Sequence, residues 1–144
     1  MSKTIGFIGV GLMGHGMAKN VVTKGYPLVV LGHRKREPVE HLLSLGAKEA
    51  KTPRELAAQC DIVHLCVTGS PQVETVVLGE QGILQGLRAG TVVIDCSTAL
   101  PDSTLRVAEA VQRAGGRYLD SPMTRTPKEA AEGRLNLLVG GDAG

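Results

Sequence analysis

The glycine pattern near the N-terminus constrains the fold of this chain more than any other feature. Gly9, Gly11 and Gly14 have the spacing G-x-G-x-x-G and lie between a short apolar run and an amphipathic stretch of helical periodicity. Gly9 permits a tight turn, Gly11 lets the backbone approach a pyrophosphate, and Gly14 lets the helix pack closely on the strand. Backbone amides of the first helical turn, which includes Leu12 and Met13, would then bind the anion. We therefore predict a dinucleotide-binding loop; the alternative is a plain strand-to-helix turn.

Apolar runs alternate with helical patterns along the whole chain. The expected strands are Thr4 to Ile8, Leu28 to Leu31, Ile62 to Val67, Thr91 to Ile94, Arg117 to Leu119 and Leu135 to Val139. Short runs rich in Val and Ile are typical of parallel strands buried on both faces. The alternation predicts a Rossmann-type, doubly wound α/β fold, with a mainly parallel sheet of about six strands and helices on both faces. We expect a single dinucleotide-binding domain over residues 1–144.

Cap residues and glycines predict where the helices begin and end. Three segments place a cap residue directly before proline, which favours a helix N-terminus: Thr52-Pro53, Ser70-Pro71 and Thr126-Pro127. Of these, Ser70-Pro71 is the weakest match. Gly25 and the pair Gly115-Gly116 are expected to end helices.

A basic cluster follows the second expected strand. A NAD-preferring domain usually has an acid about 20 residues past the loop, which bonds the ribose 2′-hydroxyl. Here Arg34, Lys35 and Arg36 occur instead, and no acid precedes Glu37. A guanidinium pairs bidentately with a 2′-phosphate, whereas a carboxylate repels it. We predict NADP as the cofactor, with NAD possible, and contacts from His33, Arg34 and Arg36; the alternative is a solvated basic turn.

Composition argues against several other classes of protein. Hydrophobic residues make up 42% of the chain and charged residues 21%, a balance that argues against disorder. A net charge of +2 and only three aromatic residues argue against a general nucleic-acid binder. No apolar run reaches the length of about 18 residues that a membrane span needs. The three cysteines lack metal-ligand spacing, so we expect a reduced, cytoplasmic protein without a metal site.

Two histidines have positions that predict their surroundings. His15 follows the glycine loop closely enough for a contact with the cofactor. His64 alternates with apolar residues inside an expected strand, so we expect a core histidine whose hydrogen bonds are satisfied. No motif places a His or Asp beside the Ser and Cys residues, so nucleophilic catalysis has no support.

Four segments, taken together, resemble a known family. Ile5 to Gly14, followed by Met17 to Asn20, resembles the N-terminal signature of the β-hydroxyacid dehydrogenases. That family includes 3-hydroxyisobutyrate dehydrogenase, tartronate semialdehyde reductase and sulfolactaldehyde reductase, with 6-phosphogluconate dehydrogenase and the imine reductases as relatives. The other three segments are similar to later family motifs in the same order: Asp95 to Thr98, Asp120 to Met123 and Gly133 to Gly141.

The resemblance implies an NADP-dependent hydroxyacid dehydrogenase or aldehyde reductase. Such an enzyme interconverts a small anionic β-hydroxy acid and its semialdehyde or aldehyde by hydride transfer. The residues implied to contact the cofactor are Val67, Thr68 and Thr98, and those implied to contact the substrate are Ser97, Thr124, Arg125 and Thr126. The alternatives are a decarboxylating or imine-reducing relative and a non-catalytic dinucleotide sensor.

The family's chains continue into a helical domain, which supplies the catalytic Lys and most of the dimer contacts. No Lys of this chain matches the catalytic one. We therefore expect no catalytic residue among these 144 residues, an isolated chain without turnover, and a full-length homo-oligomer formed through the missing domain.

The segment Thr124-Arg125-Thr126 departs from the common family pattern, which has Ser-Gly-Gly at this position. Arg125 directly precedes an expected helix N-terminus capped by Thr126, so helix amides and a guanidinium fork would meet the same anion. The sulfolactaldehyde reductase branch is similar here, since it carries Gly-Arg-Thr. The alternative for Arg125 is a surface residue without a ligand.

Overall fold

The computed structural model describes residues 3–9, 12–31, 36–67, 69–96, 101–120 and 140–141. Strands and helices alternate through most of these residues. In chain order the elements are β1 (Ile5–Ile8), α1 (Leu12–Thr23), β2 (Leu28–Leu31), α2 (Arg36–Ser44), β3 (Lys48–Ala50), α3 (Pro53–Gln59), β4 (Ile62–Leu65), α4 (Ser70–Leu78), the 3-10 helix η1 (Ile83–Gln85), β5 (Val92–Asp95), α5 (Pro101–Arg113), β6 (Arg117–Asp120) and β7 (Gly140–Gly141).

The strands form one sheet in the order β3-β2-β1-β4-β5-β6-β7. The pairs from β3 to β6 are parallel, and only the two-residue β7 runs antiparallel to its neighbour β6. Strand β1 is central, because Ile5 lies in register with Leu28 of β2 on one side and with Ile62 of β4 on the other. This topology confirms the predicted doubly wound, mainly parallel sheet.

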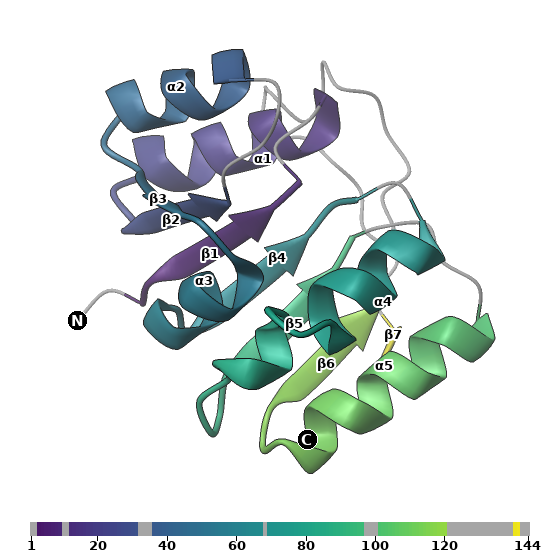
Figure 1. Cartoon of the computed structure of the whole chain (residues 1–144). Helices are drawn as coiled ribbons and strands as arrows, with labels where there is room; N and C mark the ends of the chain where they lie inside the picture. The colour runs from purple at the N-terminus through teal and green to yellow at the C-terminus, as the bar shows by residue number, and fades with distance from the viewer. Residues whose placement is uncertain are drawn as a thin grey trace.

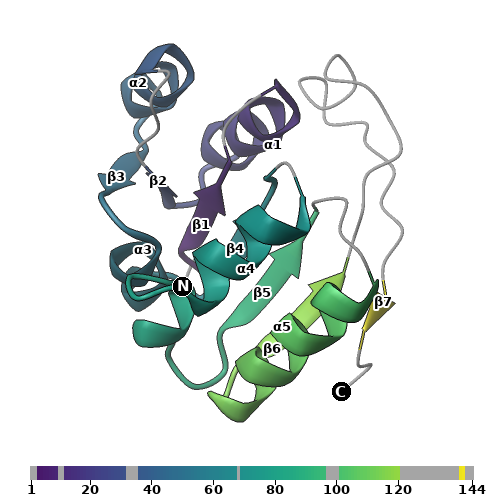
Figure 2. The same cartoon turned by 45° about the vertical axis from the view of Figure 1, so that its right-hand side comes forward.

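Helices cover both faces of the sheet, as Figures 1 and 2 show. Helices α1 and α2 lie on one face, where Phe7 and Val30 pack with Leu42 in a buried cluster. Helices α3, α4 and α5 lie on the other face, where Leu65 and Val107 belong to a second, larger cluster. Burial of each such side chain stabilises the fold by about 1.5–3 kcal/mol. The two clusters explain why the strands are continuous apolar runs.

Strand β3 was not expected from the sequence, which predicted only helices between the second and third apolar runs. Its residues Lys48 and Glu49 are exposed, and Ala50 alone is buried. It pairs with β2 and has no other strand neighbour among the described residues, and charged side chains are typical of such an edge strand. Most other strand boundaries fall within one or two residues of the expected positions. The expected strand Leu135 to Val139 lies outside the described residues.

Helix α3 begins as predicted. Thr52 is its N-cap, and the Thr52 hydroxyl accepts a hydrogen bond of 3.1 Å from the Glu55 backbone N–H. The Glu55 carboxylate accepts one of 3.3 Å from the Lys51 backbone N–H, one residue earlier than in a regular capping box. A cap of this kind contributes about 1 kcal/mol. The Thr126-Pro127 start lies outside the described residues.

The start of α4 differs from the prediction. Ser70 is the first helical residue, and Gly69 holds the N-cap position without a side-chain bond. The helix ends follow the expected rule, since Gly25 and Gly115, each two residues after the end of α1 or α5, have φ of +94° and +93°. That left-handed backbone region favours glycine.

Candidate functional site

The carboxyl ends of β1 and β4 define the candidate site. Strand β1 has β2 as its neighbour on one side within the sheet and β4 as its neighbour on the other, so the chain runs outward from β1 in both directions. Ligands of doubly wound proteins bind at such a point, where the strand order reverses. Gly9 follows β1 here, and Val67 follows β4 by two residues.

Gly9 closes the end of β1 against β4. Its φ is +97°, and a Cβ atom built on it would lie 2.0 Å from the Cys66 carbonyl oxygen. The same Cβ position is 3.3 Å from Cγ1 of Val67, which places that side chain beside the turn. Gly9 therefore has the left-handed backbone conformation that the predicted tight turn would use, and no larger residue fits the position.

Gly14 holds helix α1 against this turn. A Cβ on Gly14 would lie 1.9 Å from the Gly9 carbonyl oxygen, so the helix packs on the strand end at backbone distance. This confirms the packing role predicted from the motif. Leu12 and Met13 form the first turn of α1 through their backbone, and that turn contains no acidic residue to oppose an anion. Gly11 lies outside the described residues.

His15 contacts helix α2. Its Nε2 lies 2.8 Å from Nδ1 of His41, and the ring centroids are 5.0 Å apart. Burial, the His41 ring and the Lys19 charge lower the pKa of His15, in that order of importance. The pair joins the helix that starts at the glycine loop to the helix that follows the basic cluster. The cofactor contact of His15 stays a prediction.

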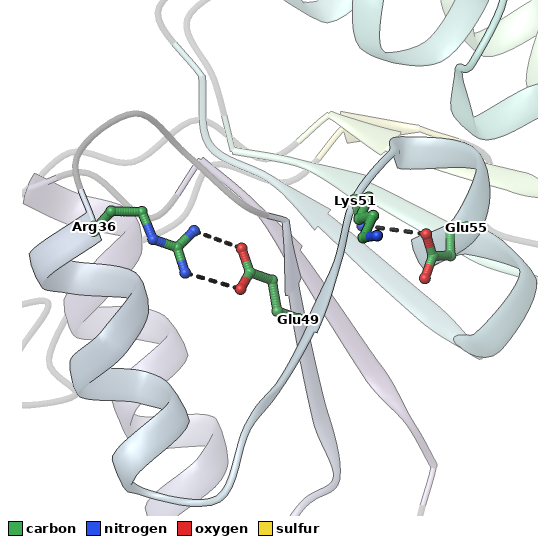
Figure 3. A network of polar contacts seen from close by, with 4 residues as sticks. All are labelled: Arg36, Glu49, Lys51 and Glu55. Atoms are coloured by element: carbon green, nitrogen blue, oxygen red, sulfur yellow. Dashed lines mark hydrogen bonds and ion pairs between the residues drawn. The ribbon is translucent and has the colours of Figure 1, made fainter.

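Arg36, the first residue of α2, pairs with Glu49 on the edge strand β3, as Figure 3 shows. Its two terminal nitrogens donate to the two Glu49 oxygens at 2.6 Å and 2.9 Å. The hydrogen bond from Arg36 lowers the pKa of the Glu49 carboxyl. The pairing occupies both terminal nitrogens of the guanidinium that was predicted to meet the cofactor.

A buried acid lies at the end of β5. Asp95 is fully buried, and its Oδ2 accepts a hydrogen bond of 2.5 Å from the Tyr118 hydroxyl of β6. In the backbone register Asp95 lies beside Asp120, which opens the expected substrate segment. Burial, and then the Asp95 charge, raises the pKa of the nearby Cys66 thiol to about 11, so the thiol is protonated at neutral pH. No sequence motif predicted the pairing of Asp95 with Tyr118.

His64 corrects one expectation. Its ring stacks on Phe7 with centroids 5.3 Å apart and planes 10° apart, so it belongs to the core. However, its buried Nδ1 has no hydrogen-bond partner among the described residues, so the histidine is not satisfied as expected. Burial lowers its pKa to about 4.

The structure thus brings together Gly9, Gly14 and Val67 with the backbone of Leu12 and Met13, and it places Arg36 at the β3 edge. The other predicted site residues lie outside the described part of the chain: Gly11, His33, Arg34, Thr68, Ser97, Thr98, Thr124, Arg125 and Thr126.

The described residues contain no group of three or more His, Cys, Asp or Glu side chains arranged to hold a metal ion. None of their helices has both the length and the apolar character required to cross a membrane.

Known proteins resemble the chain over nearly its whole length. Residues 4–144 match the family described as the NAD binding domain of 6-phosphogluconate dehydrogenase. The chain is 40% identical over 141 residues to 2-hydroxy-3-oxopropionate reductase of Escherichia coli (strain K12), covering 96% of this chain and 47% of the relative. It is 35% identical over 142 residues to human cytokine-like nuclear factor N-PAC, covering 99% and 26%. The chain therefore spans about half of the reductase and about a quarter of N-PAC.

Solved structures agree on the fold. Mycobacterium tuberculosis 3-hydroxyisobutyrate dehydrogenase with L-serine superimposes with a TM-score of 0.89 at 26% identity, over 99% of this chain and 48% of that one. Psf3 in complex with NADP+ and 2-OPP gives 0.88 at 28%, over 96% and 49%. An imine reductase variant from Myxococcus stipitatus in complex with NAD+ gives 0.86 at 25%, over 99% and 48%.

Proposed function

Because this chain belongs to the NAD-binding domain family of 6-phosphogluconate dehydrogenase, we propose that it is the NADP-binding part of an oxidoreductase that interconverts a small anionic hydroxy acid and its aldehyde. The observation that carries the proposal is the backbone packing at Gly9 and Gly14. Side chains at either position would collide with carbonyl oxygens 2.0 Å and 1.9 Å away, so the turn is closed to everything but glycine. This packing leaves the N-terminus of α1 next to the strand end, where a pyrophosphate fits.

Each part of the proposed site has a distinct task. The turn and the first amides of α1 bind the pyrophosphate through hydrogen bonds and the helix dipole. Val67, half-buried beside Gly9, offers an apolar contact to the cofactor. When bound, the nicotinamide ring supplies the hydride, and the protein supplies its orientation. No described residue is assigned a proton-transfer role.

The preference for NADP rests on the basic residues after β2. Arg34 is the first candidate for the 2′-phosphate, since a guanidinium matches phosphate oxygens with paired donors. The structural neighbour Psf3 was solved with NADP+, which supports this assignment, whereas the imine reductase neighbour was solved with NAD+, the alternative cofactor. Arg34→Ala should weaken NADPH binding about ten- to a hundredfold. Lys48→Ala, which removes a cation from the amino end of β3, is the matched control and should leave binding unchanged.

The substrate assignment rests on sequence. The 40% identity to a protein named 2-hydroxy-3-oxopropionate reductase supports a small hydroxy acid or aldehyde. Within that class we propose that Arg125 and the backbone amides of the helix expected from the sequence after Thr126 bind an anionic group, with contacts from Ser97 and Thr124. The chain covers about half of that relative, and we propose that the catalytic Lys belongs to the remainder.

A second candidate, dinucleotide binding without turnover, is favoured by the 35% identity to N-PAC, a relative named as a nuclear factor and not for a reaction. Activity of the full-length protein separates the two candidates. NADPH oxidation with 2-hydroxy-3-oxopropionate supports the reductase. Binding of NADPH with no oxidation over a panel of small hydroxy acids and aldehydes supports the second candidate.

A further inference from the structure

The ion pair between Arg36 and Glu49 lies directly beside the part of the chain that is proposed to select the cofactor. Arg36 is the residue that follows segment 32–35, which contains His33, Arg34 and Lys35. The two Glu49 carboxylate oxygens accept hydrogen bonds from the two terminal nitrogens of Arg36, at 2.6 Å and 2.9 Å (Figure 3). The carboxylate therefore has the same bidentate arrangement that a phosphate would adopt on this guanidinium.

The sheet register explains why Glu49 reaches this position. Glu49 lies beside Val30, one residue before the end of β2 at Leu31. Segment 32–35 connects Leu31 to Arg36, and Glu49 lies beside the end of β2 and is hydrogen-bonded to Arg36, so it is close to both attachment points of the segment. Its side chain shares the sheet face of α1 and α2, where Val30 is buried.

The pair is accessible and exchangeable. The side chains of Arg36 and Glu49 are 46% and 28% exposed, so water screens their attraction. Exposed pairs of this kind contribute little net stability to a fold. A doubly charged phosphate can therefore replace the carboxylate on Arg36 at small cost, while an unreplaced Glu49 repels that phosphate.

We propose that Glu49 is a specificity-determining residue, which competes with the 2′-phosphate of NADP for Arg36 and so reduces the preference of the site for NADP over NAD. This inference rests on the proposed dinucleotide-binding function. It assigns Arg36 a shared role: the guanidinium holds α2 to β3 in the empty site and turns to the phosphate when NADP binds. The adenosine of NAD has no group at the 2′ position that makes this exchange.

The test is a double-mutant cycle on the affinities of the chain for NADPH and NADH, measured by isothermal titration calorimetry. Glu49→Gln should tighten NADPH binding about two- to fivefold, the worth of one exposed ion pair, and leave NADH binding unchanged. In an Arg36→Gln background the same Glu49→Gln change should give a clearly smaller gain, because the competition for Arg36 no longer exists and only the weak repulsion between Glu49 and the phosphate is removed. Glu40→Gln is the matched control, since Glu40 acts on Arg36 by its charge. It removes the same charge from the neighbourhood of Arg36 and should have a smaller effect than Glu49→Gln.

Each outcome decides a different claim. If Glu49→Gln leaves NADPH binding unchanged or weakens it, or if the gain is undiminished without Arg36, the inference is wrong and the proposed dinucleotide function stands. If Glu40→Gln matches Glu49→Gln, general charge repulsion explains the effect and competition for Arg36 is refuted. If the unmodified chain binds neither dinucleotide, the proposed function itself fails, and this inference fails with it.

Discussion

Acidification should destabilise this protein through one buried histidine. His64 has an ordinary pKa of 6.5 when unfolded, and burial lowers the pKa to about 4 in the fold. Between these values the unfolded chain binds the proton more tightly than the folded one, so stability that is present above pH 6.5 is lost as the pH falls toward 4. With 1.36 kcal/mol per pKa unit, the full loss is about 3 kcal/mol, of which about 2 kcal/mol falls between pH 7.5 and pH 5.0.

Urea unfolding at these two pH values measures the effect. His64→Phe removes the titrating nitrogens while keeping an aromatic ring beside Phe7. Between pH 7.5 and pH 5.0, the free energy of unfolding of this variant should therefore fall by about 2 kcal/mol less than that of the unmodified chain. His15→Asn is the control. It removes an exposed imidazole whose pKa is also lowered, and it should keep most of the acid sensitivity. Identical pH dependence of the free energy of unfolding in the unmodified chain and in His64→Phe would contradict the claim that burial lowers the pKa of His64.

Three further predictions concern the glycine loop, turnover and the anion site. Gly14→Ala should cost about 1–3 kcal/mol in urea unfolding and abolish NADPH binding, because the added Cβ would lie 1.9 Å from the Gly9 carbonyl oxygen. Gly46→Ala, where an added Cβ meets no atom within 4 Å but the φ of +109° strains an alanine, should lose some stability and keep NADPH binding. NADPH affinity retained in Gly14→Ala would contradict the close-packing argument. The 144-residue chain alone should bind NADPH yet oxidise it at a negligible rate with aldehydes, because the proposed catalytic Lys, a general acid worth about 10²–10⁴-fold, is assigned to the remainder of the protein. Turnover near that of the full-length protein, followed by NADPH absorbance, would refute this. In the full-length protein Arg125→Ala should raise KM for anionic aldehydes far more than for neutral ones in steady-state assays, and an equal rise for both would remove Arg125 from the substrate site.

Local sequence rules were sufficient for the helices, the core strands and the glycine turn. Gly9 and Gly14 act on residues within a few positions or on the adjacent strand end, so a short motif with its context predicts their geometry. Thr52 and Glu55 are equally local, since a cap acts within one helical turn.

The contacts that the sequence did not predict join distant residues. Arg36 and Glu49 meet only because β3 pairs with β2, and the three residues Lys48 to Ala50, two of them charged, are too few to show the apolar alternation that marks a strand. Tyr118 reaches Asp95, 23 positions earlier, only because β5 and β6 are neighbours in register. Such pairs depend on tertiary arrangement, which overrides local propensity at an edge strand.

The cofactor is the central claim, and the affinities of the unmodified chain for NADPH and NADH test it most directly. Calorimetric titration of the two dinucleotides under identical salt and pH should give tight, one-to-one binding of NADPH. NADH should bind about ten- to a hundredfold more weakly, which corresponds to one charge-assisted pair with the 2′-phosphate. Equal affinities, or tighter binding of NADH, would contradict the assignment of the basic residues after β2, and no binding of either would contradict the dinucleotide site itself.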